Sequence, residues 1–156
     1  MKKITIKAKI NGEQRTLEVQ PMETLLEVLR ETLGLKSPKC GCDRGDCGTC
    51  TVLYDGRAVR SCLILAPEAD GREIETLEGI CRDGLTPLQK KMHELNAFQC
   101  GFCAPGMIVS ATELLRRNKK PSEGDIKEAI GGNLCRCTGY EPIIDAVKAV
   151  SGKGRR

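Results

Sequence analysis

The 156-residue sequence predicts an α+β protein in two parts, a small mixed half followed by an all-helical half. Hydrophobic residues alternate with polar residues near the N-terminus, which indicates β-strands, and from about Leu85 onward they recur at helical spacing. The ten cysteines gather mainly in two groups, one in each part. We therefore expect two domains, residues 1–80 and residues 81–156, with a glycine-containing boundary near residues 78–86.

A β-hairpin is predicted at the N-terminus. Isoleucine and alanine occupy alternate positions over residues 4–10, and Leu17 and Val19 continue the alternation after a break. The break is Asn11-Gly12, a dipeptide that favours a type I′ turn. These residues therefore predict two antiparallel strands that share one buried face.

One helix, a second hairpin and a late strand complete the first half. Thr24 is placed to cap a helix that carries leucines on one face and ends at Gly34. A second hairpin turns at the Asp-Gly pair of residues 55–56, and residues 74–77 indicate a last short strand. Two hairpins around one helix, with a late strand, are typical of a small α+β domain of the β-grasp type.

Four short helices are predicted in the second half. The first begins after Thr86 with a proline in its first turn, and the second covers residues 105–117. The third begins after Ser122 in a capping pattern and ends at the glycines of residues 131–132, and the fourth begins at Pro142. Compact connections between these helices favour a four-helix bundle.

Composition limits the classes of protein that this chain can belong to. With two Phe, two Tyr and no Trp, aromatic residues contribute little to a core, and the ten cysteines indicate another source of stability. The N-terminus lacks the pattern of a secretory signal, and no apolar run approaches the length of a membrane span. We therefore expect a cytoplasmic protein whose cysteines bind metal and form no disulfides. A net charge of +4, without a basic patch and interleaved aromatic residues, argues against nucleic-acid binding.

The first cysteine group has the spacing of a plant-type [2Fe–2S] centre. Its pattern is C-x4-C-x2-C-x11-C, with three cysteines on one loop and the fourth in the following segment. Glycines in the loop permit positive φ angles and close approach of backbone amides to an anionic cluster. The cysteines are Cys42, Cys47, Cys50 and Cys62, and the glycines are Gly41, Gly45 and Gly48.

The second cysteine group lies at predicted turns between helices. Cys100 and Cys103 lie between the first and second helices, and Cys135 and Cys137 between the third and fourth. Paired helix hairpins would bring the four sulfurs together, and helix N-termini would direct their positive dipole ends at the site. The spacing by itself is compatible with zinc, a [2Fe–2S] cluster or a [4Fe–4S] cluster.

Four segments resemble the small iron–sulfur subunit of the molybdenum hydroxylases, the family of xanthine oxidase and carbon monoxide dehydrogenase. They follow the same order as in that family and span nearly the whole chain. The segments are CDRGDCGTCTV (residues 42–52), SCL (61–63), QCGFCAPGM (99–107) and GNLCRCTGY (132–140). The resemblance implies a β-grasp ferredoxin domain followed by a four-helix bundle, each with one [2Fe–2S] cluster.

The resemblance also implies roles for the two groups. The first group would ligate the outer cluster on the flavin side, and the second would ligate the inner cluster next to the molybdenum cofactor. Gln99 would contact the pterin, and Cys137 would lie against it. The chain would pass single electrons between a molybdopterin centre on a large subunit and FAD on a medium subunit, in an assembly that can double to a dimer of heterotrimers.

Some alternatives and some residues remain outside this interpretation. The same clusters would serve the reductive direction in an aromatic-thioester reductase, and a zinc-stabilised interaction module is a further alternative. Cys40 and Cys81 match no ligand of the family, so we expect a spectator thiol and a buried or half-buried small residue, respectively. We expect His93, the only histidine, at the surface.

Overall fold

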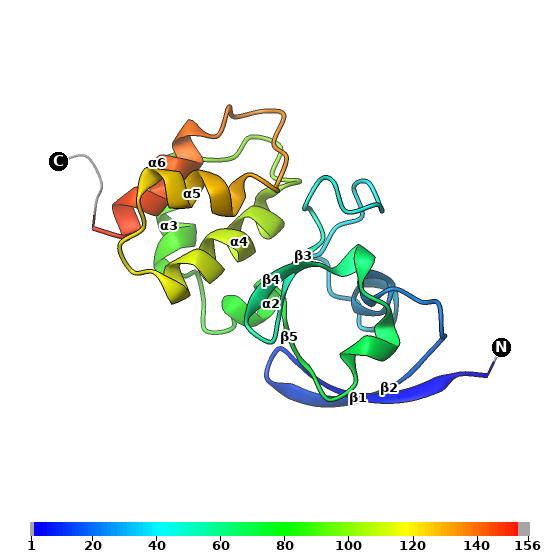
Figure 1. The fold of residues 1–156 in the computed structure, drawn as a ribbon. Helices are drawn as coiled ribbons and strands as arrows, with labels where there is room; N and C mark the ends of the chain where they lie inside the picture. Colours follow the sequence, from blue (N-terminus) through cyan, green and yellow to red (C-terminus); the bar gives the residue numbers. More distant parts are fainter. Residues whose placement is uncertain (1, 153–156) are drawn as a thin grey trace.

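A computed structural model describes residues 2–152 and shows two bodies side by side, a twisted sheet with its helix and a bundle of helices (Figure 1). The hairpin nearest the N-terminus lies at the outer edge of the first body, away from the bundle, and the last helix lies in the bundle. The α+β fold class is confirmed. Among the described residues, no helix combines the length and the apolar character needed to cross a bilayer.

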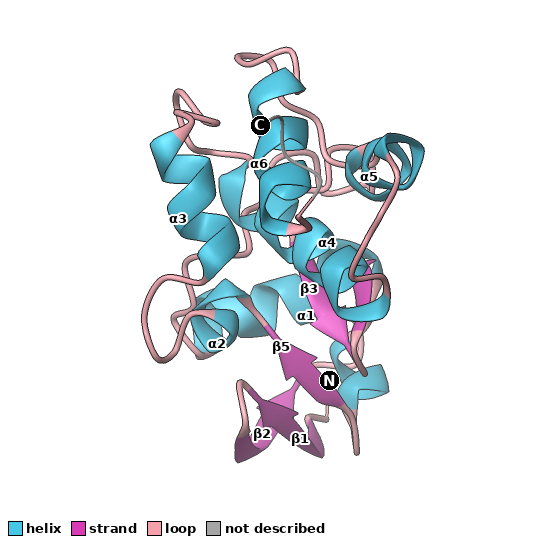
Figure 2. Cartoon of the chain, turned by 90° about the vertical axis from the view of Figure 1, so that its left-hand side faces the viewer, coloured by secondary structure: helices cyan, strands magenta, loops and turns pink. Residues whose placement is uncertain are grey.

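The first half is built on a five-stranded mixed sheet (Figure 2). The strand order is β2-β1-β5-β3-β4, and every pair is antiparallel except β1 with β5. Both predicted hairpins form, because Asn11 and Gly12, like Asp55 and Gly56, adopt the positive φ angles of the type I′ turn. The strands are β1 Ile4–Ile10, β2 Glu13–Val19, β3 Thr51–Tyr54, β4 Arg57–Arg60 and β5 Glu73–Glu75.

The helix of the first half is shorter than the sequence predicts. Thr24 caps it as expected, accepting a hydrogen bond from the Glu27 N–H at 3.2 Å, and α1 covers Leu25–Glu27. The chain then continues as a π-helical turn, Val28–Thr32, and Leu25 and Leu29 of these two segments pack in the core with the sheet. The wider turn leaves a half-buried leucine, Leu33, at the edge of this core.

The last predicted strand ends earlier than residue 77. The side chain of Asn11 accepts a hydrogen bond from the Thr76 N–H at 2.8 Å and donates one to the Thr76 hydroxyl at 3.0 Å. Because these bonds replace the sheet ladder, β5 stops at Glu75 and a short helix, α2 Leu77–Ile80, follows. The prediction of Leu77 as a strand residue was therefore wrong.

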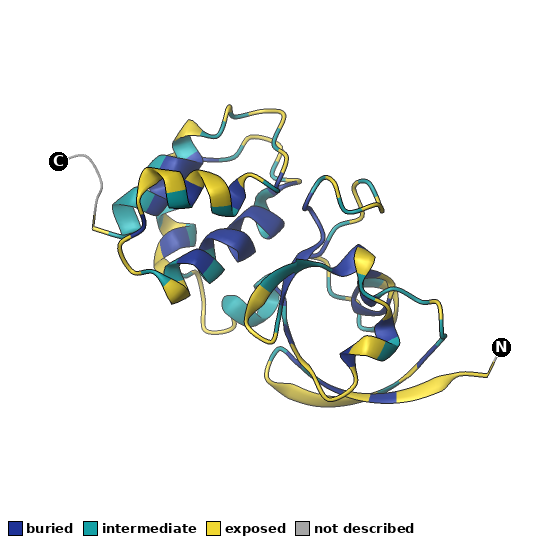
Figure 3. Ribbon diagram, in the orientation of Figure 1, coloured by how far each residue is buried: buried dark blue, intermediate teal, exposed yellow. Residues whose placement is uncertain are grey.

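The second half contains the four predicted helices around one apolar core. Its buried residues come from all four helices, and they form a cluster separate from that of the first half (Figure 3). Because the two cores are separate, we propose the expected division between residues 80 and 81, with Leu77 as a residue of the first half that packs against the second core. The helices are α3 Pro87–Glu94, α4 Ala104–Arg117, α5 Glu123–Ile130 and α6 Glu141–Val150.

Candidate metal centres

The first cysteine group lies in the irregular loop that leads into β3 and in the turn that follows β4. Cys50 immediately precedes β3, and Cys62 lies in a 3₁₀ turn, Ser61–Leu63. Both cysteines are buried and pack with Leu26 of α1, whereas Cys42 and Cys47 are half-buried in the loop. The strand end and the 3₁₀ turn thus bring together two cysteines that 11 residues separate in the sequence.

The sulfurs of the first group form two pairs. The Cys47 N–H donates to the Cys42 sulfur at 3.4 Å, and hydrogen bonds from the backbone N–H groups of Arg44 and Cys47 lower the pKa of Cys42 to about 7. Burial, together with a hydrogen bond to Cys50, raises the pKa of Cys62 to about 12. The loop backbone therefore favours the thiolate form of Cys42, whereas the pair of Cys50 and Cys62 is buried against Leu26.

The second cysteine group connects three helices. Cys103 is the N-cap of α4, Cys100 lies just before it, and Cys135 and Cys137 lie in the loop between α5 and α6. The sulfurs of Cys100 and Cys137 are 3.7 Å apart, and both residues are exposed. Cys103 is buried and hydrogen bonds to Cys135; burial first, and then this bond, raise the pKa of Cys103 to about 12. The second group also consists of two sulfur pairs.

A compact turn surrounds Cys135. Its N–H donates to the Tyr140 hydroxyl at 2.9 Å, and its sulfur lies 3.2 Å from the Thr138 hydroxyl. Burial acts to raise the pKa of Cys135, but hydrogen bonds, first of all that with Thr138, outweigh burial and lower it. Tyr140 has a positive φ of 71°, which turns its side chain back over this loop at the start of α6.

The chemistry of the two groups fits a two-iron cluster in each. Within residues 2–152, no three Cys, His, Asp or Glu side chains are gathered as they are around a single metal ion. Each group instead presents four thiols as two pairs, which matches two thiolates on each iron of a [2Fe–2S] cluster with four cysteine ligands. The 14-residue helix α4 begins directly after Cys103, so its N-terminal dipole favours negative charge at the second group.

A buried asparagine bridges the loops that carry the two cysteine groups. Asn133 is buried, accepts a hydrogen bond from Ser110 at 2.8 Å, and donates to the Gly48 carbonyl at 2.9 Å and to the Thr51 hydroxyl at 3.2 Å. Beside it, the Leu134 N–H donates to the Cys47 carbonyl at 2.9 Å. A cysteine of the first group is therefore one backbone hydrogen bond away from the residue that precedes Cys135.

The two halves approach so closely here that side chains are excluded. A Cβ at Gly48, whose φ is 72°, would lie 2.3 Å from the Gly132 carbonyl, and a Cβ at Gly106 would lie 2.4 Å from the Gly48 carbonyl. The Arg60 guanidinium of β4 also donates to the Gly132 carbonyl at 2.6 Å. The first group's loop therefore packs directly against the N-terminus of α4 and the loop that carries Cys135.

Other candidate residues lie as follows. The Gln99 side chain is exposed and donates to the Cys137 carbonyl at 3.1 Å, so these two residues are neighbours. Cys40 is exposed, Cys81 is half-buried, and neither contacts a sulfur of either group at hydrogen-bond distance. His93 is exposed on α3, as expected.

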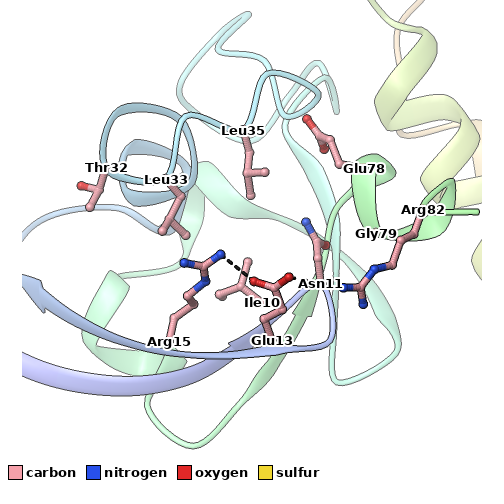
Figure 4. Close-up of a pocket in the computed structure, with 10 residues that line it drawn as sticks. All are labelled: Ile10, Asn11, Glu13, Arg15, Thr32, Leu33, Leu35, Glu78, Gly79 and Arg82. Carbon is pink, nitrogen blue, oxygen red and sulfur yellow. Dashed lines mark hydrogen bonds and ion pairs between the residues drawn. The ribbon is translucent and has the colours of Figure 1, made fainter.

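A pocket of about 390 Å³ lies apart from both cysteine groups, between the β1–β2 hairpin, the end of the π turn and α2 (Figure 4). Its Glu13 is held between Arg15 at 2.6 Å and Arg82 at 3.3 Å, and its Glu78 is bonded to Ser37. The four charged side chains of this pocket therefore all have partners within the chain.

Sequence reasoning missed Asn133 and Thr138. Both lie inside the segment 132–140. Nothing in the spacing of this segment indicates that Asn133 bonds to the first half of the chain or that Thr138 lies against a cysteine sulfur. The useful signal was their position, because polar residues next to metal-ligand cysteines commonly hydrogen bond the ligands.

Comparison with known proteins identifies the family. Residues 8–86 match the model of the 2Fe-2S iron-sulfur cluster binding domain, and residues 76–148 match that of the [2Fe-2S] binding domain. The chain is 47% identical, over 97% of its length and 92% of the relative's, to the nicotine 6-hydroxylase small subunit of Paenarthrobacter nicotinovorans. The chain belongs to the iron–sulfur subunits of the molybdenum hydroxylase family.

Two further relatives agree with this identification. The xanthine dehydrogenase iron-sulfur-binding subunit of Escherichia coli O157:H7 is 48% identical, over 92% of each chain. A chain of quinoline 2-oxidoreductase from Pseudomonas putida 86 is 46% identical, with a TM-score of 0.92 over 97% of this iron–sulfur subunit and 96% of that chain. The subunit is thus an electron-transfer component that carries [2Fe–2S] clusters. Neither the zinc module nor the reductive alternative is favoured.

Proposed function

We propose that this subunit relays single electrons between a molybdopterin centre on a large partner subunit and FAD on a medium partner subunit. When bound, each [2Fe–2S] cluster takes up and releases one electron. The observation that carries the proposal is the close approach of the two cysteine-bearing loops, which are joined by the hydrogen bond from the Leu134 N–H, next to Cys135, to the Cys47 carbonyl. No general base or nucleophile is needed in such a chain, since its role is to hold and tune the clusters.

The eight paired cysteines are the proposed ligands. The outer cluster would be held by the first group, where backbone amides support the sulfur of Cys42. The inner cluster would be held by the second group, at the N-terminus of α4. The outer ligands are Cys42, Cys47, Cys50 and Cys62, and the inner ligands are Cys100, Cys103, Cys135 and Cys137.

An exposed face beside the second group is the proposed contact with the large subunit. Cys100 and Cys137 are exposed, and Phe102 and Leu134 beside them keep 47% and 55% of their surface accessible. Large apolar side chains that are exposed together are unfavourable in water and favourable under a partner. Gln99 lies at the same place, so its amide and the Cys137 sulfur are the proposed neighbours of the pterin.

A large and a medium subunit would complete a heterotrimer that can pair into a dimer of heterotrimers. The ten cysteines all lie within the described residues and are free thiols, which is compatible with the proposed cytoplasmic location.

Native purification followed by metal, flavin and subunit analysis tests this function. We expect the chain to co-purify with molybdenum, FAD and two larger subunits, and to show two distinct [2Fe–2S] signals by electron paramagnetic resonance (EPR) after reduction. Isolation of a stable chain with zinc and no acid-labile sulfide would contradict the proposal.

A further inference from the structure

The Thr138 hydroxyl is placed to donate its proton to the sulfur of Cys135. Its oxygen accepts a hydrogen bond from the Tyr140 N–H at 3.3 Å and lies 3.2 Å from the Cys135 sulfur. A threonine hydroxyl has one proton and two acceptor sites. Because the Tyr140 N–H occupies one acceptor site, the single proton remains available for Cys135. Once Cys135 is a thiolate ligand it has no proton to give, so the hydroxyl must be the donor.

The turn around Thr138 fixes this arrangement. The Cys135 N–H donates to the Tyr140 hydroxyl at 2.9 Å, so the tyrosine closes the loop from the other side. Gly139 and Tyr140 have φ angles of 64° and 71°, which bend the backbone sharply after Thr138. Backbone and side chain of Tyr140 therefore hold both ends of the contact between Thr138 and Cys135.

The first cysteine group also contains a threonine beside a cysteine sulfur, but the hydroxyl proton of this threonine is used elsewhere. The Thr49 hydroxyl lies 3.2 Å from the Cys47 sulfur, the same distance as in the second group. However, Thr49 donates its proton to the Lys39 carbonyl at 2.9 Å. Because a hydroxyl has only one proton and Thr49 gives it to this carbonyl, the Cys47 sulfur receives no comparable hydrogen bond from Thr49.

We propose that Thr138 is a positioning residue that donates a hydrogen bond to the Cys135 thiolate and raises the reduction potential of the second cluster. Thr49 does not do the same for the first. The inference rests on the proposed ligand roles of Cys135 and Cys47. A hydrogen bond to a cluster sulfur stabilises the more negative, reduced state more than the oxidised state. Thr138 therefore favours uptake of an electron at the second group.

An EPR-monitored redox titration of the full chain with both clusters tests this. Thr138→Val retains the shape and removes the proton, so we expect the potential of the second cluster alone to fall. The expected change in its equilibrium for electron uptake is about tenfold, which is about 59 mV for a one-electron couple. Thr138→Ser retains the hydroxyl and restores the wild-type potential. Thr49→Val is the matched control and leaves both potentials unchanged.

Two results would overturn the role of Thr138. One is a second-cluster potential in Thr138→Val equal to that of the wild type, and the other is an equal shift in Thr138→Val and Thr138→Ser. A measurement on the wild type avoids dependence on the folding of variants. After brief transfer to D2O, a hydroxyl proton exchanges faster than hydrogen-bonded amide protons, so EPR-detected nuclear resonance should show a proton coupled to the second cluster that exchanges faster than the amide protons around it. Its absence would also overturn the inference, whereas wild-type protein without two clusters would instead contradict the proposed function.

Discussion

The two cysteine groups place their sulfurs in different kinds of structure. The first uses an irregular loop and a 3₁₀ turn, and all four of its cysteines are buried or half-buried within the first half. The second uses the ends of three helices and leaves Cys100 and Cys137 exposed. The chain itself thus covers much of the first group, whereas the second has an open side that a partner subunit can cover.

Removing one buried cysteine from each group gives the largest expected effect. Cys50→Ser should remove the first cluster, and Cys103→Ser the second, because a serine hydroxyl does not replace a thiolate ligand. Iron and acid-labile sulfide should fall by at least half in each variant, and EPR should still detect the other cluster.

The two cysteines outside the groups are controls for that experiment. Cys40→Ser and Cys81→Ser should keep the full iron content, since neither thiol lies with a sulfur pair. Loss of iron in Cys40→Ser, with retention in a Cys42→Ser variant, would mean that the first group uses Cys40 as its ligand.

The next largest effect is expected at the contact between the groups. Asn133→Ala removes a buried side chain that bonds Ser110, Gly48 and Thr51, so it should lower the free energy of unfolding by about 3 kcal/mol. Urea unfolding followed by circular dichroism and by cluster absorbance measures this change. Gln14→Ala, at an exposed position of β2, should change stability by less than about 0.5 kcal/mol. Equal stability of both variants would show that the asparagine does not hold the halves together.

A smaller effect is expected at Glu78, which connects α2 to the loop before the first group. Burial acts to raise its pKa, but hydrogen bonds from Ser37 and Thr76 outweigh burial and lower it. Its stabilising contribution is therefore present above the unfolded pKa of about 4.3 and is lost as pH falls through the lower folded pKa. Glu78→Gln should lower stability at pH 7 by about 1.5 kcal/mol and flatten the decline at acid pH.

Unfolding of this variant at several pH values measures both changes. Asp83→Asn is a matched control, because Asp83 is an exposed acidic residue just after α2. A steep acid decline that persists in Glu78→Gln would assign the acid sensitivity to other carboxylates.

The smallest effect separates two arginines of β4. Arg60→Met loses the bond to the Gly132 carbonyl and should cost about 1 kcal/mol in thermal or urea unfolding. Arg57→Met loses a long ion pair, 3.7 Å, between its exposed guanidinium and Glu113, a carboxylate that Arg117 also pairs with at 3.1 Å, so it should cost less than about 0.5 kcal/mol. If Arg57→Met lost more stability than Arg60→Met, Arg60 would not be the arginine of β4 that stabilises the contact between the halves.

Local patterns predicted most of the fold. Turn dipeptides, capping residues and helical spacing act over a few residues, so they located both hairpins and all four helices of the second half. The π turn at Val28–Thr32 and the end of β5 depend on contacts with distant residues, such as Asn11 with Thr76. No local pattern encodes such contacts.

The sequence predicted the two cysteine groups unequally. The cysteine spacing of the first group is typical of a plant-type [2Fe–2S] centre. The C-x-C pair of the second group is also compatible with zinc, so its metal was undecided until the family was identified. The pairing of Cys103 with Cys135, across 31 intervening residues, required the bundle to be folded. The contacts of Asn133 and Thr138 likewise depend on side chains that only the three-dimensional structure brings near.

The hydrogen bond from Leu134 to Cys47 has a thermodynamic consequence for loading of the clusters. Because each loop is held in part by the other, ordering one loop around its cluster stabilises the conformation that the other cluster requires. Such coupling is reciprocal, so the factor by which the first cluster improves retention of the second equals the factor by which the second improves retention of the first. The two centres of this subunit are thus linked in occupancy as well as in space.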